Sequence, residues 1–180
     1  MYFRKLIGKK CYLSPMDIND AEKYTEWLND LEVISNLTIY NSVINTETEK
    51  DFLVKLSKEH NYSIVDNAAN KLIGSCGFTD LDHLNLTSEA GIFIGDKNYW
   101  NKGYGTEALV LLLDYGFKVL NLHNVMLRVY SLNERAIRSY EKAGFKKIGT
   151  RREALRRGDK TFDIVLMDLL YEDFYKKNQQ

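Results

Sequence analysis

Residues 99–108 read YWNKGYGTEA, and this stretch says most about how the chain folds. Gly103 and Gly105 stand two positions apart, just before a run whose apolar side chains recur at helical spacing. Glycines at a helix start let the backbone approach an anion, which the free amides and dipole of the first turn then hold. Lys102 adds a positive charge. The stretch therefore predicts an anion cradle that leads into a helix over about 103–119.

The same glycines allow two other interpretations. The residues from Gly103 to Ala108 also satisfy the dinucleotide-binding pattern G-x-G-x-x-G/A. In that fold the first glycine follows a strand almost directly, whereas eight residues separate Ile94 from Gly103 here. No G-x-x-x-x-G-K-[ST] is present, which excludes a P-loop nucleotidase. A further possibility stays open at this point, namely that the two glycines serve only to let the helix pack closely against its neighbours.

Outward from this stretch, short strands and helices alternate irregularly, and several strands are joined directly by hairpins. This pattern predicts a mixed α/β (α+β) fold, a mixed sheet with helices on its faces. No segment has the composition of a linker, so we expect a single domain over residues 1–180. The expected strands lie at 10–14, 61–66, 71–79, 88–95, 124–130, 145–150 and 162–169. The expected helices run from Asp17 to about Asn29, from Thr46 past Leu56, over 103–119 and over 133–143, the last ended by Gly144.

Composition excludes several protein classes. With 44% hydrophobic and 28% charged residues, the chain is neither disordered nor fibrous, and 180 residues can bury a core without a disulfide or a metal. Cys11 and Cys76 form no framework and no CxxC, which predicts two ordinary thiols in a reducing cytoplasm and no metal site. The longest apolar runs are too short to cross a bilayer, and no secretory signal is visible.

The zero net charge is unevenly distributed. Residues 1–100 hold 10 basic and 15 acidic residues, and residues 101–180 hold 15 and 10. Halves of opposite sign suggest an anionic ligand on the second half and a cationic one near the first, unless the asymmetry is a chance feature of a solvated surface.

Taken together, these stretches resemble the GNAT N-acetyltransferases, in particular the RimJ/RimL-like and spermidine acetyltransferase branches. GNAT proteins carry Gln/Arg-x-x-Gly-x-Gly/Ala, whose amides bind the pyrophosphate of acetyl-CoA. Residues 100–105 match this pattern except at the first position, where Trp100 replaces the general Gln or Arg, as is familiar in the RimJ/RimL-like branch. Residues 133–145 match a second pattern, an Asn, a short helix carrying a Tyr, and Gly-Phe. A third match, GxxREA, begins at Gly149. The resemblance implies the GNAT fold, with a central, mixed, mostly antiparallel sheet of about seven strands and helices on both faces.

The resemblance also implies an acetyl-CoA site. The backbone of residues 92–94 would pair with pantetheine as an added strand, and the loop with the helix start would hold the pyrophosphate. Asn133 reads on its own as a helix N-cap, and by resemblance it would also touch the pantetheine arm or the phosphates. The expected cofactor-binding residues are Ile92, Phe93, Ile94, Trp100, Asn101, Lys102, Gly103, Tyr104, Gly105, Thr106 and Asn133.

The implied reaction is direct attack of an amine on the thioester in a ternary complex, since neither cysteine lies at a matched catalytic position. The amine must lose a proton, and the departing thiolate must gain one. Glu89 matches an acidic position common in this branch and is the candidate base, unless it is a surface or supporting residue. Tyr140 shares the inward face of its helix with Ala136 and Ile137 and is the candidate general acid, unless it only fills the core.

The acceptor stays open among a ribosomal or other protein N-terminus, a polyamine and an amino sugar. In the family the two N-terminal helices usually form the acceptor wall, so the acidic first half favours a cationic acceptor. Residues 146–160 hold seven basic and two acidic residues. We expect a solvated hairpin or a CoA phosphate contact there, and no nucleic-acid partner, because no RNA-binding motif accompanies them.

Three further points follow from the same sequence. Homodimers are frequent in the family, so a homodimer is compatible with the resemblance. A non-catalytic acyl-CoA sensor with the same fold is the alternative function. A nucleotide-dependent oxidoreductase is a third hypothesis, and it would require that NAD or NADP bind where acetyl-CoA does not.

Overall fold

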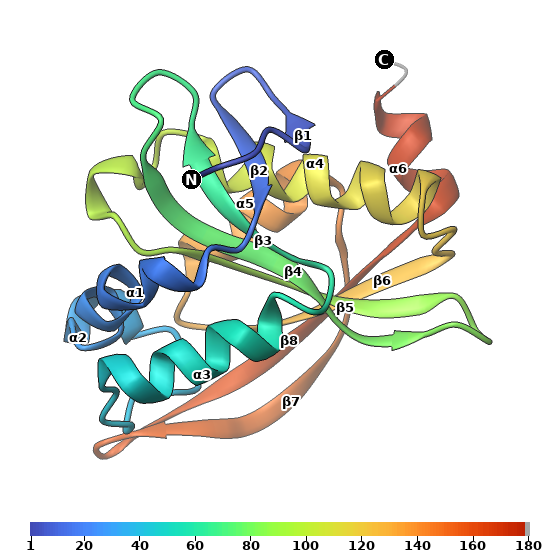
Figure 1. The fold of residues 1–180 in the computed structure, drawn as a ribbon. Helices are drawn as coiled ribbons and strands as arrows, with labels where there is room; N and C mark the ends of the chain where they lie inside the picture. The colour runs from blue at the N-terminus through green and yellow to red at the C-terminus, as the bar shows by residue number, and fades with distance from the viewer. Residues whose placement is uncertain (179–180) are drawn as a thin grey trace. The chain divides into compact units, whose positions relative to one another are not determined.

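The computed structural model describes residues 1–178 of the chain (Figure 1). Its strands are β1 Leu6–Ile7, β2 Cys11–Pro15, β3 Asn61–Asp66, β4 Leu72–Asp82, β5 Thr87–Ile94, β6 Asn124–Tyr130, β7 Lys146–Arg157 and β8 Lys160–Leu170. Its α-helices are α1 Ala21–Leu28, α2 Leu31–Ile34, α3 Thr46–Leu56, α4 Tyr104–Lys118, α5 Glu134–Ala143 and α6 Tyr171–Asn178. Two 3-10 helices, Ile18–Asp20 and Lys97–Tyr99, precede α1 and α4.

The strands form one sheet in the order β1-β2-β3-β4-β5-β6-β8-β7. Its described pairs are antiparallel except that β5 runs parallel to β6. This confirms the predicted mixed, mostly antiparallel sheet, with eight strands in place of about seven. The parallel pairing covers Thr87–Asn124, Ser88–Val125 and Glu89–Met126, although β5 continues to Ile94. The described pairing between β5 and β6 therefore ends at Glu89.

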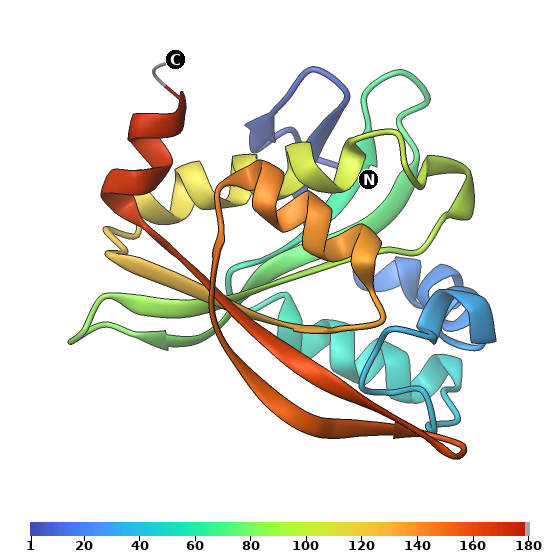
Figure 2. The ribbon, with the colours of Figure 1, turned by 180° about the vertical axis from the view of Figure 1, so that it is seen from behind.

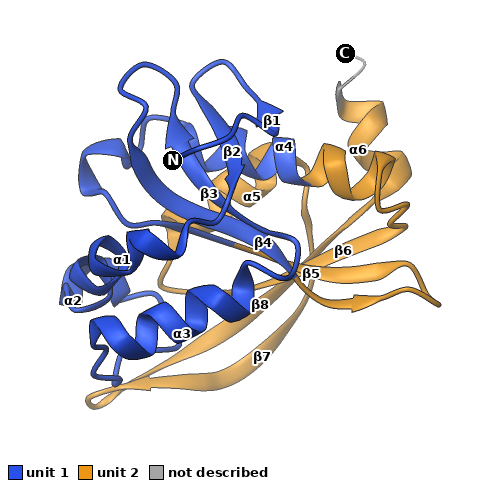
Figure 3. Cartoon of the chain, viewed as in Figure 1, with its two compact units in different colours: residues 1–78, 92–112 blue, residues 79–91, 113–180 orange. Residues whose placement is uncertain are grey.

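Contacts divide the chain into two compact units (Figure 3). Unit 1 comprises residues 1–78 and 92–112, and unit 2 comprises residues 79–91 and 113–178 of the described chain. Each of the two units is discontinuous in sequence, and the single domain expected from the sequence stays a prediction. Strands β4 and β5 and helix α4 each contribute residues to both units.

In unit 1, α1 and α3 lie on the side of the strands seen in Figure 1, and the first half of α4 lies on the side seen in Figure 2. The apolar faces of α1, α2 and α3 meet in one cluster, in which Trp27 packs edge-on against Tyr24 with ring centroids 5.5 Å apart. Asn45 starts α3 through a capping box with Thr48. The start signal at Thr46 is thus confirmed, with Asn45 as the cap.

In unit 2, β6 and β8 bury alternate apolar side chains, and α6 packs on the second half of α4. Phe174 of α6 lies 5.3 Å from Phe117 between ring centroids, and the Tyr175 hydroxyl donates to Asp114 at 3.2 Å. Helix α5 ends at Gly144, whose φ of 113° is the left-handed conformation predicted from the sequence.

Three short elements were not predicted, namely β1, α2 and α6. Strand β1 has two residues and helix α2 has four, which is too few for either to show a hydrophobic period in the sequence. Strands β7 and β8 are also longer than expected, because the basic run continues as paired strand to Arg157. Its basic side chains are exposed except for the half-buried Arg157, as expected of a solvated hairpin.

Gly74 of β4 offers a test of the packing beside β5. A Cβ added there would meet the carbonyl oxygen of Phe93, which cannot move without displacing the strand. Gly74→Ala should therefore lower the free energy of unfolding by about 1–3 kcal/mol, measured by urea denaturation. Gly91→Ala, where a Cβ would meet nothing within 4 Å, is the matched control and should stay within about 0.5 kcal/mol of the wild type. An equal loss in both variants would contradict this account.

Candidate active site

The predicted anion cradle is a loop held in left-handed conformations. Asn101 has φ 58° and Gly103 has φ 83°, and α4 begins at the next residue, Tyr104. The first amides of a helix have no acceptor within the helix, so they are available to a bound anion. A Cβ on Gly105 would lie 3.7 Å from the side chains of Ile92 and Ile94, an ordinary contact. Close packing therefore does not explain Gly105.

Side chains from distant parts of unit 1 fix this loop. The indole N–H of Trp100 donates to the carbonyl of Ile94 at 2.8 Å, so this predicted cofactor residue also ties the loop to β5. The Tyr104 hydroxyl donates to the buried Asp66 at 2.8 Å, and this hydrogen bond raises the pKa of Tyr104 to about 12. The Tyr104 side chain thus anchors the helix start, and its contribution to anion binding would come from the backbone.

Lys10 is a residue of the cradle that the sequence did not single out. Its ammonium donates to the carbonyl of Lys102 at 2.6 Å, and its backbone N–H donates to Glu107 at 2.6 Å. The ammonium also lies 5.8 Å from the centroid of the Tyr104 ring. Two lysines, Lys10 and Lys102, therefore flank the helix start. No local pattern could have indicated Lys10, because it lies more than ninety residues away along the chain.

The predicted pantetheine strand is half-buried. Ile92, Phe93 and Ile94 all have intermediate exposure, and the Phe93 ring packs edge-on against Trp27 with centroids 6.1 Å apart. The structure thus brings residues 92–94, Trp100–Gly103 and the start of α4, including Gly105 and Thr106, together in unit 1.

In unit 2, Glu89 lies at the end of the parallel pairing and is in an ion pair. Its Oε1 accepts from Nε of Arg128 on β6 at 2.9 Å, and only 18% of its side chain is exposed. The guanidinium therefore holds one carboxylate oxygen of the candidate base. No local sequence pattern indicates this partner, because Arg128 lies 39 residues further along the chain.

Tyr140 lies on the buried face of α5, as predicted, with 9% of its surface exposed. Its ring stands 6.1 Å from that of Phe145, and its carbonyl accepts from the N–H groups of Gly144 and Phe145. Burial raises the pKa of Tyr140 to about 12, opposed by Arg135, so the hydroxyl keeps its proton at neutral pH. Within residues 1–178 no hydrogen bond joins this hydroxyl to another group. The hydroxyl is thus a protonated donor without a protein acceptor.

Asn133 caps α5 through a bond from the Ala136 N–H to its side chain at 3.2 Å, as its sequence position predicts. The side-chain oxygen is therefore already used in holding the helix that carries Tyr140. Among the described residues, no group of three or more His, Cys, Asp or Glu side chains is placed to hold a metal. No helix in residues 1–178 is long and apolar enough to span a bilayer.

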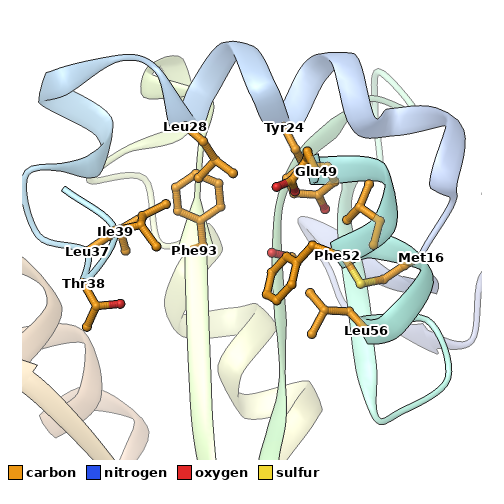
Figure 4. Close-up of a pocket in the computed structure, with 12 residues that line it drawn as sticks. Met16, Tyr24, Leu28, Leu37, Thr38, Ile39, Glu49, Phe52, Leu56 and Phe93 are labelled. Atoms are coloured by element: carbon orange, nitrogen blue, oxygen red, sulfur yellow. The ribbon is translucent and has the colours of Figure 1, made fainter. Parts of the chain in front are cut away.

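Unit 1 also contains an apolar cavity of about 190 Å³ (Figure 4). Its walls come from α1, α3, β5 and the 37–39 segment, with Leu28, Phe52 and Phe93 among the lining side chains. Phe52 is 51% exposed, so the cavity reaches the surface. Glu49 of α3 is the charged residue in this lining, and it is only 4% exposed.

Glu49 was not singled out by the sequence analysis, although a signal was present. It lies four and seven residues before Leu53 and Leu56, on the apolar face of α3. Burial raises the pKa of its carboxyl to about 7. A carboxylate on the apolar face of a helix costs free energy unless a cation or proton compensates it.

The chain is similar to known acetyltransferases. Residues 10–146 match the family described as "Acetyltransferase (GNAT) domain". An N-acetyltransferase p20 of Bacillus licheniformis, of uncharacterised function, is 29% identical over 94% of this chain and 97% of its own length. The spermidine N(1)-acetyltransferase of Escherichia coli K12 is 31% identical over 77% of this chain and 68% of its own length.

The fold also matches a solved structure. The spermidine N-acetyltransferase of Vibrio cholerae, in complex with CoA and spermine, superposes with a TM-score of 0.83. The identity is 22%, and the match covers 93% of this chain and 99% of the other. This likeness shows that the two chains share the fold.

The burial of Glu49 predicts a pH-dependent stability. Since its pKa is raised on folding, the folded protein binds more protons than the unfolded one between about pH 4.5 and 7, and stability is lost as pH rises through this window. Glu49→Gln removes this loss. The variant should gain roughly 2–3 kcal/mol relative to wild type between pH 5 and pH 8, measured by urea denaturation. Glu47→Gln, on the exposed side of the same helix turn, should show no such gain. A constant difference for Glu49→Gln at both pH values would refute the burial effect.

Proposed function

Because this chain belongs to the GNAT family of acetyltransferases, we propose that it moves the acetyl group of acetyl-CoA directly onto a primary amine in a ternary complex. The observation that carries the proposal is the cradle at the start of α4, with left-handed Asn101 and Gly103, flanking lysines, and a Gly105 that packing does not require. This arrangement suits a pyrophosphate. The thioester supplies an activated acetyl group, and the chain supplies the binding and the proton transfers.

The binding part of the proposal rests on unit 1. Backbone amides at Gly103–Thr106 would hold the pyrophosphate, with Lys10 and Lys102 balancing its charge. Residues 92–94 would pair through their backbone with the pantetheine amides. The Lys10 ammonium beside these amides would strengthen anion binding, because charge-assisted hydrogen bonds are about twice as strong as neutral ones.

The catalytic part rests on Glu89 and Tyr140. Removing a proton from an alkylammonium group costs about 4–5 kcal/mol at pH 7, against about 1 for a peptide α-amine. We propose that Glu89 accepts this proton, with Arg128 orienting its carboxylate. Tyr140 would donate to the sulfur as the C–S bond breaks, so that the product leaves as the thiol. Its protonated hydroxyl without a protein acceptor supports this role.

The acceptor in this proposal is a protein N-terminus or a small amino compound such as a polyamine. Two relatives are named for spermidine, and the acidic first half of the chain is suited to a cation. We also propose that the chain lies in the RimJ/RimL-like branch, on the evidence of Trp100 and the GxxREA stretch at Gly149. Units 1 and 2 would act as one catalytic domain in a reducing compartment, where the buried Cys11 and Cys76 stay free thiols.

Thiol release tests the function directly. The protein is incubated with acetyl-CoA at about pH 8 and with spermidine, peptides beginning with Ala or Ser, or an amino sugar. Amine-dependent release with at least one acceptor class is the expected result. Tight acetyl-CoA binding with no release for any amine would instead favour the acyl-CoA sensor, and a thermal shift with NAD but not acetyl-CoA would favour the oxidoreductase.

Tyr140→Phe tests the general acid. The variant should fold normally, because the lost hydroxyl has no protein partner in residues 1–178. Turnover should fall roughly 10- to 1,000-fold, the range that general acids contribute, with little change in acetyl-CoA affinity. Tyr171→Phe removes a hydroxyl from the exposed side of α6 and serves as the control. Unchanged turnover of Tyr140→Phe would remove Tyr140 from the mechanism.

A further inference from the structure

The cavity lined by α1, α3 and Phe93 contains one charge that its surroundings do not compensate. Glu49 is 96% buried, and no described residue forms an ion pair or a hydrogen bond with its carboxylate. Figure 4 shows its carboxylate turned among the lining side chains beside Tyr24. The hydroxyl of Tyr24, the other titratable group in the lining, donates instead to the carbonyl of Gly74 at 3.2 Å.

An uncompensated acid at this position is costly. Its neighbours on the same face, Leu53 and Leu56, show that an apolar side chain would suit the site. Burial raises the pKa of Glu49 to about 7 and so favours the neutral acid, whereas a cation bound beside it would favour the carboxylate. The first turn of α3 assists the ionised form, because the helix dipole is positive there. The site is therefore suited to pairing with one buried cation.

The size and position of the cavity restrict what that cation belongs to. A cavity of about 190 Å³ exceeds the roughly 150 Å³ that holds a benzene molecule, so it has room for a short hydrocarbon segment. Phe93 lies in its wall and also in β5, the strand proposed to pair with pantetheine. A molecule in this cavity is therefore held next to the strand along which the acetyl donor would lie, as an acceptor must be.

We propose that this cavity takes the non-reacting end of the acceptor, an alkyl chain ending in one ammonium group that pairs with Glu49. The acceptor class is then a linear diamine, one amine of which is anchored while the other is acetylated. This inference rests on the proposed acetyl transfer to an amine.

The same cavity disfavours longer polyamines. One carboxylate compensates one charge, and a second ammonium inside the apolar walls would lose its hydration without gaining a partner. A linear diamine places only methylene groups between its two nitrogens. A polyamine with an internal ammonium three or four carbons from its end would bring that charge against Leu28, Phe52 or Phe93. With Glu49 as the one carboxylate of the cavity lining, the cavity would favour an acceptor that places a single ammonium group inside it over one that places two there.

The test compares two acceptors that differ by one ammonium group. The specificity constant kcat/KM is measured by thiol release for 1,5-diaminopentane and for pentylamine. In the wild type the diamine should be preferred, and Glu49→Gln should reduce the ratio of the two constants by roughly 10- to 100-fold, the range of a hydrogen bond to a charged group. Glu49→Leu should reduce it at least as far. Glu47→Gln, whose side chain is exposed on the same turn, should keep the wild-type ratio.

Two results would overturn the inference. One is an unchanged ratio in Glu49→Gln, since the carboxyl would then be a neutral core group. The other is a larger kcat/KM for spermidine than for 1,5-diaminopentane in the wild type, since the cavity would then accept a second charge.

A binding measurement separates this inference from the proposed function. Titration calorimetry with 1,5-diaminopentane and CoA-loaded protein needs no turnover. The wild type should bind the diamine roughly 10- to 100-fold more tightly than Glu49→Gln. Equal affinities would refute the anchor even in an active enzyme. Binding that depends on Glu49 without any thiol release would refute the acetyl transfer and leave the anchor in place.

Discussion

The conformation of the chain just before α4 is the constraint on which the candidate site depends. Helix amides can be offered to an anion only if the preceding residues turn away from the helix axis, and here Asn101 and Gly103 do so with positive φ. That conformation is unfavourable for most residues, so the surrounding structure has to hold it. Trp100 bonded to Ile94, and Lys10 bonded to Lys102, supply this support from two sides.

Two glutamates, the half-buried Glu89 and the buried Glu49, have different surroundings. Glu89 faces Arg128, which holds a positive charge 2.9 Å from one carboxylate oxygen. Glu49 faces leucine, phenylalanine and methionine side chains, and no described cation compensates it. The first arrangement is complete in the protein alone. The second leaves the carboxylate without a partner among the described residues, and the ammonium group of the proposed acceptor would supply one.

Local patterns predicted much of the fold and part of the site. The caps of α5, with Asn133 before it and Gly144 after it, follow from single residues and lie where the sequence places them. The glycine stretch predicted the cradle, and helical spacing predicted that Tyr140 faces inward. The position of Glu49 also carries a local signal, since an acid four residues before Leu53 breaks the apolar face of α3. The very short β1 and α2 carry no such signal, because fewer than five residues show no hydrophobic period.

By itself, the sequence determined the helix starts and stops, the left-handed end of α5 at Gly144 and the mixed, hairpin-rich sheet, because each depends on residues adjacent or one turn apart. Only the tertiary structure decided that Lys10 reaches Lys102, that Arg128 pairs with one oxygen of Glu89, and that Glu49 lines a cavity in which no described basic side chain pairs with it. These pairings join residues far apart in the chain. Their energies depend on burial and on the distance between charges, which no local pattern contains.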